Sequence, residues 1–135
     1  MNIYTGFRWN GVNCVFKNGT LLPAARSQAV RNHSPDGFNW SYGGSGPAQL
    51  ALAILLEELP VSLAARLYQQ FKADFVCRWK EDSFLVTSHE IGAWLNYRKK
   101  KVLEIHRQML EGIEDFGSLS EVLDVTYDER RETPG

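Results

Sequence analysis

Short runs of β-forming residues alternate with turn-forming pairs at the start of the chain. The pairs Asn10-Gly11 and Asn18-Gly19 supply the positive φ angles that two-residue hairpin turns require. Because such turns join strands that pair with each other, the pattern predicts an antiparallel β-meander, which ends at Pro23. The predicted strands cover residues 3–9, 12–16 and 20–22.

The next segment shows no regular spacing of apolar residues until a group of aromatic side chains. Residues 24–32 are polar and unpatterned, which predicts a loop, and residues 34–37 have the composition of a type I turn. Phe38, Trp40 and Tyr42 then alternate with polar residues, so an extended chain would place all three rings on one face. Such a stripe is typical of half a sheet core, although aromatic stripes also stack nucleic-acid bases.

Apolar residues recur at helical spacing in two segments on either side of Pro60. Pro47 suits the first helical position, and residues 48–59 are apolar on almost every side, which predicts a buried helix. Residues 61–72 carry apolar side chains on one face only, which predicts an amphipathic helix. That face consists of Leu63, Leu67 and Phe71.

The remainder of the chain predicts a β-hairpin followed by one long helix. Residues 75–79 and 83–87 are β-forming runs around a polar turn. Ser88 suits an N-cap, and a helical stripe then continues over residues 89–114. At this length the helix would be on the order of 37 Å long, about the width of the domain. Its apolar positions are Ile91, Trp94, Leu95, Val102, Ile105, Met109 and Ile113.

These elements predict an α+β fold. It consists of an N-terminal antiparallel β-meander, two central helices, a β-hairpin and a long C-terminal helix. A chain of 135 residues is long enough to bury a core of this kind. We expect residues 1–95 to form the α+β core domain, and residues 96–135 to form a helical extension with an acidic tail.

Charge and cysteine usage narrow the class of partner and the compartment. The formal net charge is -1, so no global charge attracts nucleic acid or an anionic membrane surface. The longest apolar run, residues 50–56, is too short to span a bilayer. Cys14 and Cys77 have no ligand spacing and no secretory segment precedes them, so we expect buried, reduced thiols. We therefore expect a cytoplasmic protein that binds neither a membrane nor, in the main, nucleic acid.

The most distinctive segment is Gly43-Gly44-Ser45-Gly46. Glycines that precede a helix expose backbone N–H groups, which together with the helix dipole form an anion site. Pro47 removes one of these N–H groups, and the lysine of a phosphate-binding P-loop is absent. Two interpretations stay open: a tight turn that needs glycine for close packing, and a phosphate or nucleotide site. In either case we expect a positive φ at Gly44 or Gly46.

A catalytic interpretation of the same segment makes Ser45 the nucleophile of a hydrolase. Proline stands two residues after Ser45, where the nucleophile-elbow motif has glycine, and only the fold could bring His33 beside Ser45 as a base. His33, His89 and His106 have no spacing typical of metal ligands. We therefore expect no catalytic residue, no metal and no cofactor.

The long helix carries the residues for which we expect contact with another molecule. A helix of this length cannot bury its whole apolar stripe on so small a domain. A stripe left in water would be a larger apolar patch than soluble monomers usually expose. Three occupants of the stripe stay open: a second copy in a homodimer, a partner protein, or the chain's own tail. The adjacent basic run would contact phosphates or an acidic protein surface, or else face the acidic tail. The predicted contact residues are Arg98, Lys99, Lys100, Lys101, Val102, Ile105 and Met109.

Residues 33–53, with the sequence HSPDGFNWSYGGSGPAQLALA, resemble the signature of a bacterial family of unknown function. The resemblance extends through residues 67–72 to residues 91–95. Members of this family are short proteins found on chromosomes, plasmids and phages, and the resemblance brings no activity, cofactor or catalytic residue. It implies a bacterial or mobile-element setting, in which small proteins of this size often inhibit host defence.

The function that we expect is therefore that of a non-catalytic binding protein of phage or mobile-element type. It would act by protein–protein contact, for example as an inhibitor of a host defence system. The alternatives are a small-ligand binder with a phosphate or nucleotide at Gly43–Gly46, and a hydrolase that uses Ser45.

Overall fold

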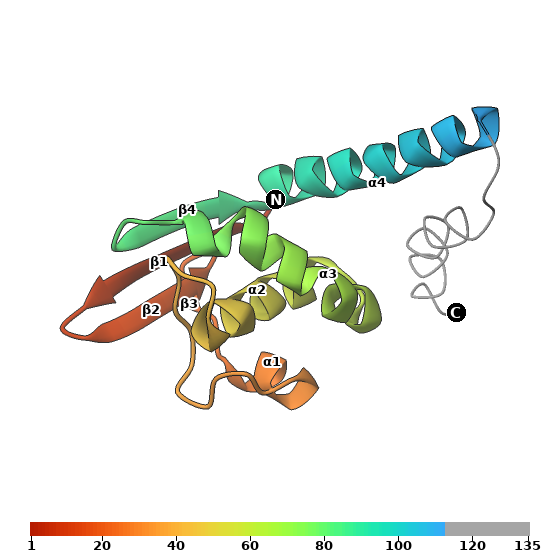
Figure 1. The fold of residues 1–135 in the computed structure, drawn as a ribbon. Coiled ribbons are helices and arrows are strands. Elements are labelled where there is room, and N and C mark those ends of the chain that lie inside the picture. The colour runs from red at the N-terminus through yellow and green to blue at the C-terminus, as the bar shows by residue number, and fades with distance from the viewer. Residues whose placement is uncertain (113–135) are drawn as a thin grey trace. The chain divides into compact units, whose positions relative to one another are not determined.

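The N-terminal segment folds into the predicted meander. In the computed structural model, which describes residues 1–112, β1 (Ile3–Trp9), β2 (Val12–Lys17) and β3 (Thr20–Leu21) pair in sequence (Figure 1). The turn residues Asn10 and Gly11 have φ angles of 49° and 76°, and Asn18 and Gly19 have 52° and 81°. All four are positive, as two-residue turns that match the twist of the strands require.

The fourth strand joins the other side of β1. β4 (Ser83–Thr87) pairs antiparallel with β1, which gives the strand order β3-β2-β1-β4. The predicted hairpin between residues 75–79 and 83–87 is therefore wrong, because residues 76–78 form a short 3-10 helix, η1 (Val76–Arg78). A β-forming run becomes a strand only where a partner strand is available, and the free edge of β1 is already paired with β4. Val76 is buried in the core instead.

Three helices follow the meander. Residues 24–32 are not the predicted loop, since they contain α1 (Ala25–Val30), a polar helix whose buried residue Ser27 is held by a side chain of α2. α2 (Ser45–Glu58) and α3 (Val61–Asp74) lie side by side (Figure 1) and meet at Pro60, as predicted. Pro47 is the third helical residue rather than the first. It is tolerated there because the first N–H groups of a helix have no intrahelical partner.

The core lies around α2. Each residue of α2 from Gly46 to Leu56 is buried, which explains why this helix is apolar on every side. The inner face of the sheet contributes a second set of buried residues, and α3 contributes one face. The inner sheet residues are Tyr4, Gly6, Val15, Phe84 and Val86, and the α3 residues are Leu63, Ala64, Tyr68 and Phe71.

The long C-terminal helix is α4 (Ser88–Glu111). The chain divides into two compact units, residues 1–88 and a second unit that begins at His89. Ile91 and Trp94 are the buried residues of α4. The predicted helix end, Ile113 and the acidic tail lie outside the described residues, and the predicted boundary between residues 95 and 96 stays a prediction.

Candidate functional site

The glycine segment starts α2, but its backbone differs from our expectation. Gly44 is the N-cap with φ -91°, and neither Gly44 nor Gly46 has a positive φ, so that prediction is wrong. The chain turns earlier, at Gly37 with φ 106° and at Ser41 with φ 88°. Ser41 holds this unusual conformation because its N–H donates to Val76 and its hydroxyl donates to the carbonyl of Trp79, at 3.1 Å and 2.5 Å.

Steric room explains the glycines better than backbone conformation does. A Cβ atom on Gly44 would lie 2.4 Å from the Tyr42 ring, and one on Gly46 would lie 2.7 Å from Cβ of Asn39. Gly43 has open space, is exposed, and its carbonyl accepts a 3.2 Å hydrogen bond from Lys72. These distances support the close-packing interpretation at Gly44 and Gly46. Binding of an anion at Gly43–Gly46 stays a prediction.

The aromatic segment before the glycines is not a strand, and its three rings do not share one environment. Trp40 is fully buried and packs edge-on against Phe84, with ring centroids 5.0 Å apart. Phe38 is half-buried and Tyr42 is exposed. The positive φ of Ser41 breaks the alternation of an extended chain, so the predicted common face is wrong.

His33 finds a tyrosine rather than a serine. Its Nε2 lies 2.5 Å from the Tyr68 hydroxyl, while its backbone N–H donates to the buried side chain of Gln49 at 2.8 Å. The amide of Gln49 in turn donates to Ser27 and to the carbonyl of Arg31. This part of the structure ties α1 and the following loop to α2 and α3, and it lends no support to Ser45 and His33 as a catalytic pair.

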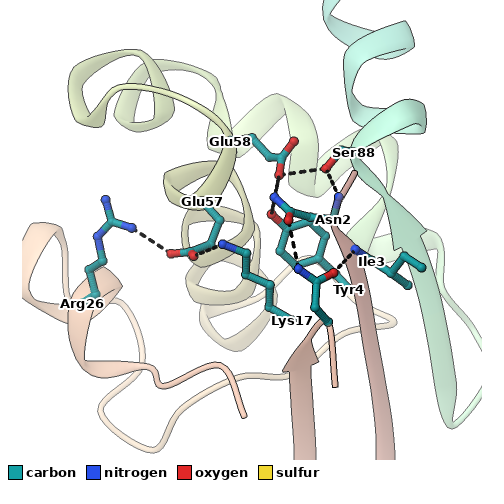
Figure 2. A network of polar contacts seen from close by, with 9 residues as sticks. Asn2, Ile3, Tyr4, Lys17, Arg26, Glu57, Glu58 and Ser88 are labelled. Carbon is teal, nitrogen blue, oxygen red and sulfur yellow. Dashed lines mark hydrogen bonds and ion pairs between the residues drawn. The ribbon is translucent and has the colours of Figure 1, made fainter. Parts of the chain in front are cut away.

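Two adjacent carboxylates at the end of α2 join this helix to the sheet (Figure 2). Oε2 of Glu58 accepts hydrogen bonds from the Tyr4 hydroxyl at 2.5 Å, the Asn2 amide at 2.8 Å and the Ser88 hydroxyl at 3.0 Å. Glu57 accepts from Lys17 at 2.8 Å and from Arg26 at 2.7 Å. One sequence signal marks this cluster, a pair of acids at the end of an apolar helix, and our sequence analysis did not single it out.

Tyr4 and Glu57 both have pKa values displaced from their ordinary ones. Burial, followed by the hydrogen bond to Glu58, raises the pKa of Tyr4 far above its ordinary value. The hydrogen bond from Lys17 lowers the pKa of Glu57; partial burial opposes this effect, and the charges of Lys17 and Arg26 add to it. The partners of these groups belong to the domain itself. The cluster therefore fixes the N-terminal strand and Ser88 on the end of α2.

The outer face of the sheet is apolar as well. On β1, the odd-numbered residues point away from the buried side chains of the inner face. The register places Phe7 beside Cys14 and Trp9 beside Val12, and the rings of Phe7 and Phe16 stack with centroids 5.7 Å apart. We call this surface the outer sheet face. It consists of Ile3, Thr5, Phe7, Trp9, Val12, Cys14, Phe16, Leu21, Ser83, Leu85 and Thr87.

The predicted contact residues lie on a part of α4 that has no buried side chain. From Leu95 to Gly112 no residue is buried. Ile105 is exposed, Val102 and Met109 are half-buried, and Arg98 lies over the Trp94 ring at 5.4 Å. Lys99, Lys100 and Lys101 are exposed, and the ammonium group of Lys101 lies 5.8 Å from the Tyr97 ring.

A protein-family model matches residues 4–97, well over half of the chain. The chain belongs to DUF6166, a family of unknown function. No curated protein and no solved structure matches the chain. The DUF6166 match confirms the family resemblance seen in the sequence, and it ends directly before the basic run that starts at Arg98.

The part of this DUF6166 chain that the structure describes contains neither a cluster of metal-binding side chains nor a membrane-spanning helix. Within residues 1–112, no three His, Cys, Asp or Glu side chains are placed to hold a metal ion. Over the same residues, no helix combines the length and apolar character needed to cross a bilayer. Cys14 and Cys77 are both free thiols, but they are half-buried rather than buried as expected.

Proposed function

We propose that this protein is a non-catalytic binding protein that acts by contact with a partner protein through α4. The observation that carries the proposal is the length of α4 beyond Trp94 without one buried residue. An isolated helix of this length has little stability in water, and most helical stability in proteins comes from packing of an apolar face. A partner that covers the stripe would supply that packing.

The charges beside the stripe define the chemistry of the partner. Val102, Ile105 and Met109 follow one another at three- and four-residue steps, so they share one side of the helix. Arg107 is paired along the helix with Glu104 and Glu111, whereas Lys99–Lys101 are exposed at the start of the stripe. The partner would therefore offer an apolar groove with an acidic rim, the helix-in-groove mode of recognition. The mobile-element setting implied by the family resemblance makes a host defence protein the first class to test.

Matched single substitutions on α4 test this proposal. Ile105→Asp places a charge in the stripe, and Leu103→Asp places the same charge at an exposed apolar position two residues earlier, on the opposite side of the same helix. Partner recovery from host cells, quantified by mass spectrometry, should fall at least tenfold for Ile105→Asp and stay near the wild-type level for Leu103→Asp. Circular dichroism would check that both variants are folded. Equal recovery of every partner by all three proteins would contradict the proposal.

The basic run gives a second test. Lys99→Glu with Lys100→Glu should slow association with an acidic partner, most strongly at low salt, because charges at the rim of an interface mainly affect the association rate. If the association rate of the wild-type protein does not depend on salt, the partner has no acidic rim and this part of the proposal is wrong.

A further inference from the structure

The outer sheet face differs from the solvated face of an ordinary antiparallel sheet. Such sheets commonly bury one face and expose a polar one, so that apolar and polar residues alternate along each strand. Here the inner residues of β1 are Tyr4, Gly6 and Arg8, whereas the outer ones include Ile3, Phe7 and Trp9. The outer side is thus the more apolar of the two.

The apolar side chains form one continuous surface across the four strands. Thr5 lies opposite Phe16 on one side and Leu85 on the other, and Phe16 lies opposite Leu21. Six large side chains on this surface are between 39% and 65% exposed, and Phe16, which lies among them, is half-buried. The six are Ile3, Phe7, Trp9, Val12, Leu21 and Leu85.

The area and the charge of this face fit a second copy of the chain. Since large side chains present roughly 150–250 Å² each, the exposed fractions amount to on the order of 600 Å², near the ~800 Å² per partner of a standard interface. No residue of the face is charged. A twofold interface brings a surface against itself, so a charged face would repel its own copy, whereas a neutral one does not. Homodimer interfaces are also the more apolar class of protein interface.

We propose that the outer sheet face is a homodimer interface, in which two copies pack their sheets face to face. The two outer faces would form a shared core, with the sheets about 10 Å apart as in other sheet-on-sheet packings. Trp9 and Phe7 supply the large aromatic surfaces that dominate such contacts. This surface is separate from the α4 contact proposed above, and the two proposals fail independently.

Sedimentation velocity on the full chain tests the oligomeric state. We expect a dimer at micromolar concentration, and we expect Trp9→Glu with Leu85→Glu to convert it to a monomer. Both side chains are exposed, so a folded monomer should result, with a circular dichroism spectrum like that of the wild type. Val12→Lys is a milder variant at the first residue of β2, and it should raise the dimer dissociation constant at least tenfold. The control, Leu103→Glu with Leu110→Glu, changes two exposed apolar residues of α4 and should leave the dimer intact.

The two free thiols give an independent readout. Cys14 lies on the outer sheet face opposite Phe7, and Cys77 lies on η1. In the dimer, Cys14 should react with iodoacetamide at least fivefold more slowly than in the Trp9→Glu/Leu85→Glu variant, while the rate at Cys77 stays unchanged. A monomeric wild-type protein would overturn the proposal. So would a dimer that survives the sheet substitutions but dissociates with the α4 substitutions.

Discussion

The guanidinium group of Arg8 lies over the ring of Trp40, with Cζ 4.2 Å from the ring centroid. The same group donates hydrogen bonds to the carbonyl of Trp40 at 2.8 Å and to the side chain of Asn39 at 2.9 Å. It also forms an ion pair with Asp82 at 3.2 Å. One residue of β1 therefore holds both the segment before the glycines and the turn before β4. The planar fork of arginine is needed for this combination of stacking and several donated bonds.

Replacement of Arg8 by lysine should destabilise the fold although the charge is kept. Lysine cannot stack its head group in the same way, and it would leave carbonyl and amide acceptors in the half-buried segment without donors. We expect a loss of about 2 kcal/mol in the free energy of unfolding, measured by urea denaturation. Arg26→Lys is the matched control, because Arg26 is exposed and pairs with Glu57 by one contact, and it should change stability by less than about 0.5 kcal/mol.

Alanine substitutions along the glycine segment should follow the steric room at each position. Gly46→Ala drives a Cβ atom against the backbone and Cβ of Asn39 and should cost about 1–3 kcal/mol. Gly44→Ala meets the exposed Tyr42 ring, which can move, and should cost less. Gly43→Ala has open space and serves as the control. Equal thermal denaturation midpoints for the three variants would contradict the packing explanation.

The ion pairs of Glu57 with Lys17 and Arg26 should make the free energy of unfolding depend on pH in the acid range. The folded-state pKa of Glu57 lies below its ordinary value, mainly because Lys17 donates a hydrogen bond to it. This contribution is present above the unfolded-state pKa and is lost as pH falls through the folded-state pKa. Glu57→Gln should therefore reduce stability by about 1 kcal/mol at pH 7 and by less at pH 3. Urea denaturation at both pH values measures the difference, and an equal loss at both would refute the assignment.

Tyr4 should remain protonated in the folded protein well beyond the range in which tyrosines titrate. Because the pKa of Tyr4 is raised in the folded state, its contribution to stability is fully present below the unfolded-state pKa. That contribution is lost as pH rises from the unfolded-state pKa through the folded-state pKa. In the folded protein, the absorbance change at 295 nm near pH 10 should be the same for wild type and Tyr4→Phe. The difference should appear only when the wild-type protein unfolds in alkali. A smaller titration amplitude for folded Tyr4→Phe would show that Tyr4 ionises in place.

Local signals in the sequence determined the hairpin turns and the break between the central helices. Asn-Gly pairs favour the tight turns that join two strands, and a proline beyond the first turn of a helix removes a hydrogen bond and clashes with the preceding turn, so neither feature depends on the rest of the fold. The bounds of β1 and the order of β1, β2 and β3 followed from these signals. The apolar character of α2 on every side likewise indicated its place in the core.

Tertiary structure decided the features that need a distant partner. Residues 75–79 are β-forming, but β4 pairs with β1, and the run becomes η1 instead. Gly44 and Gly46 at the start of α2 are required by the positions of Tyr42 and Asn39, which backbone preferences alone do not reveal. The outer sheet face arises only when four strands bring their outward residues together. The carboxylates of Glu57 and Glu58 meet Lys17 and Tyr4 across the fold, because a hydrogen bond forms wherever packing places a donor beside an acceptor.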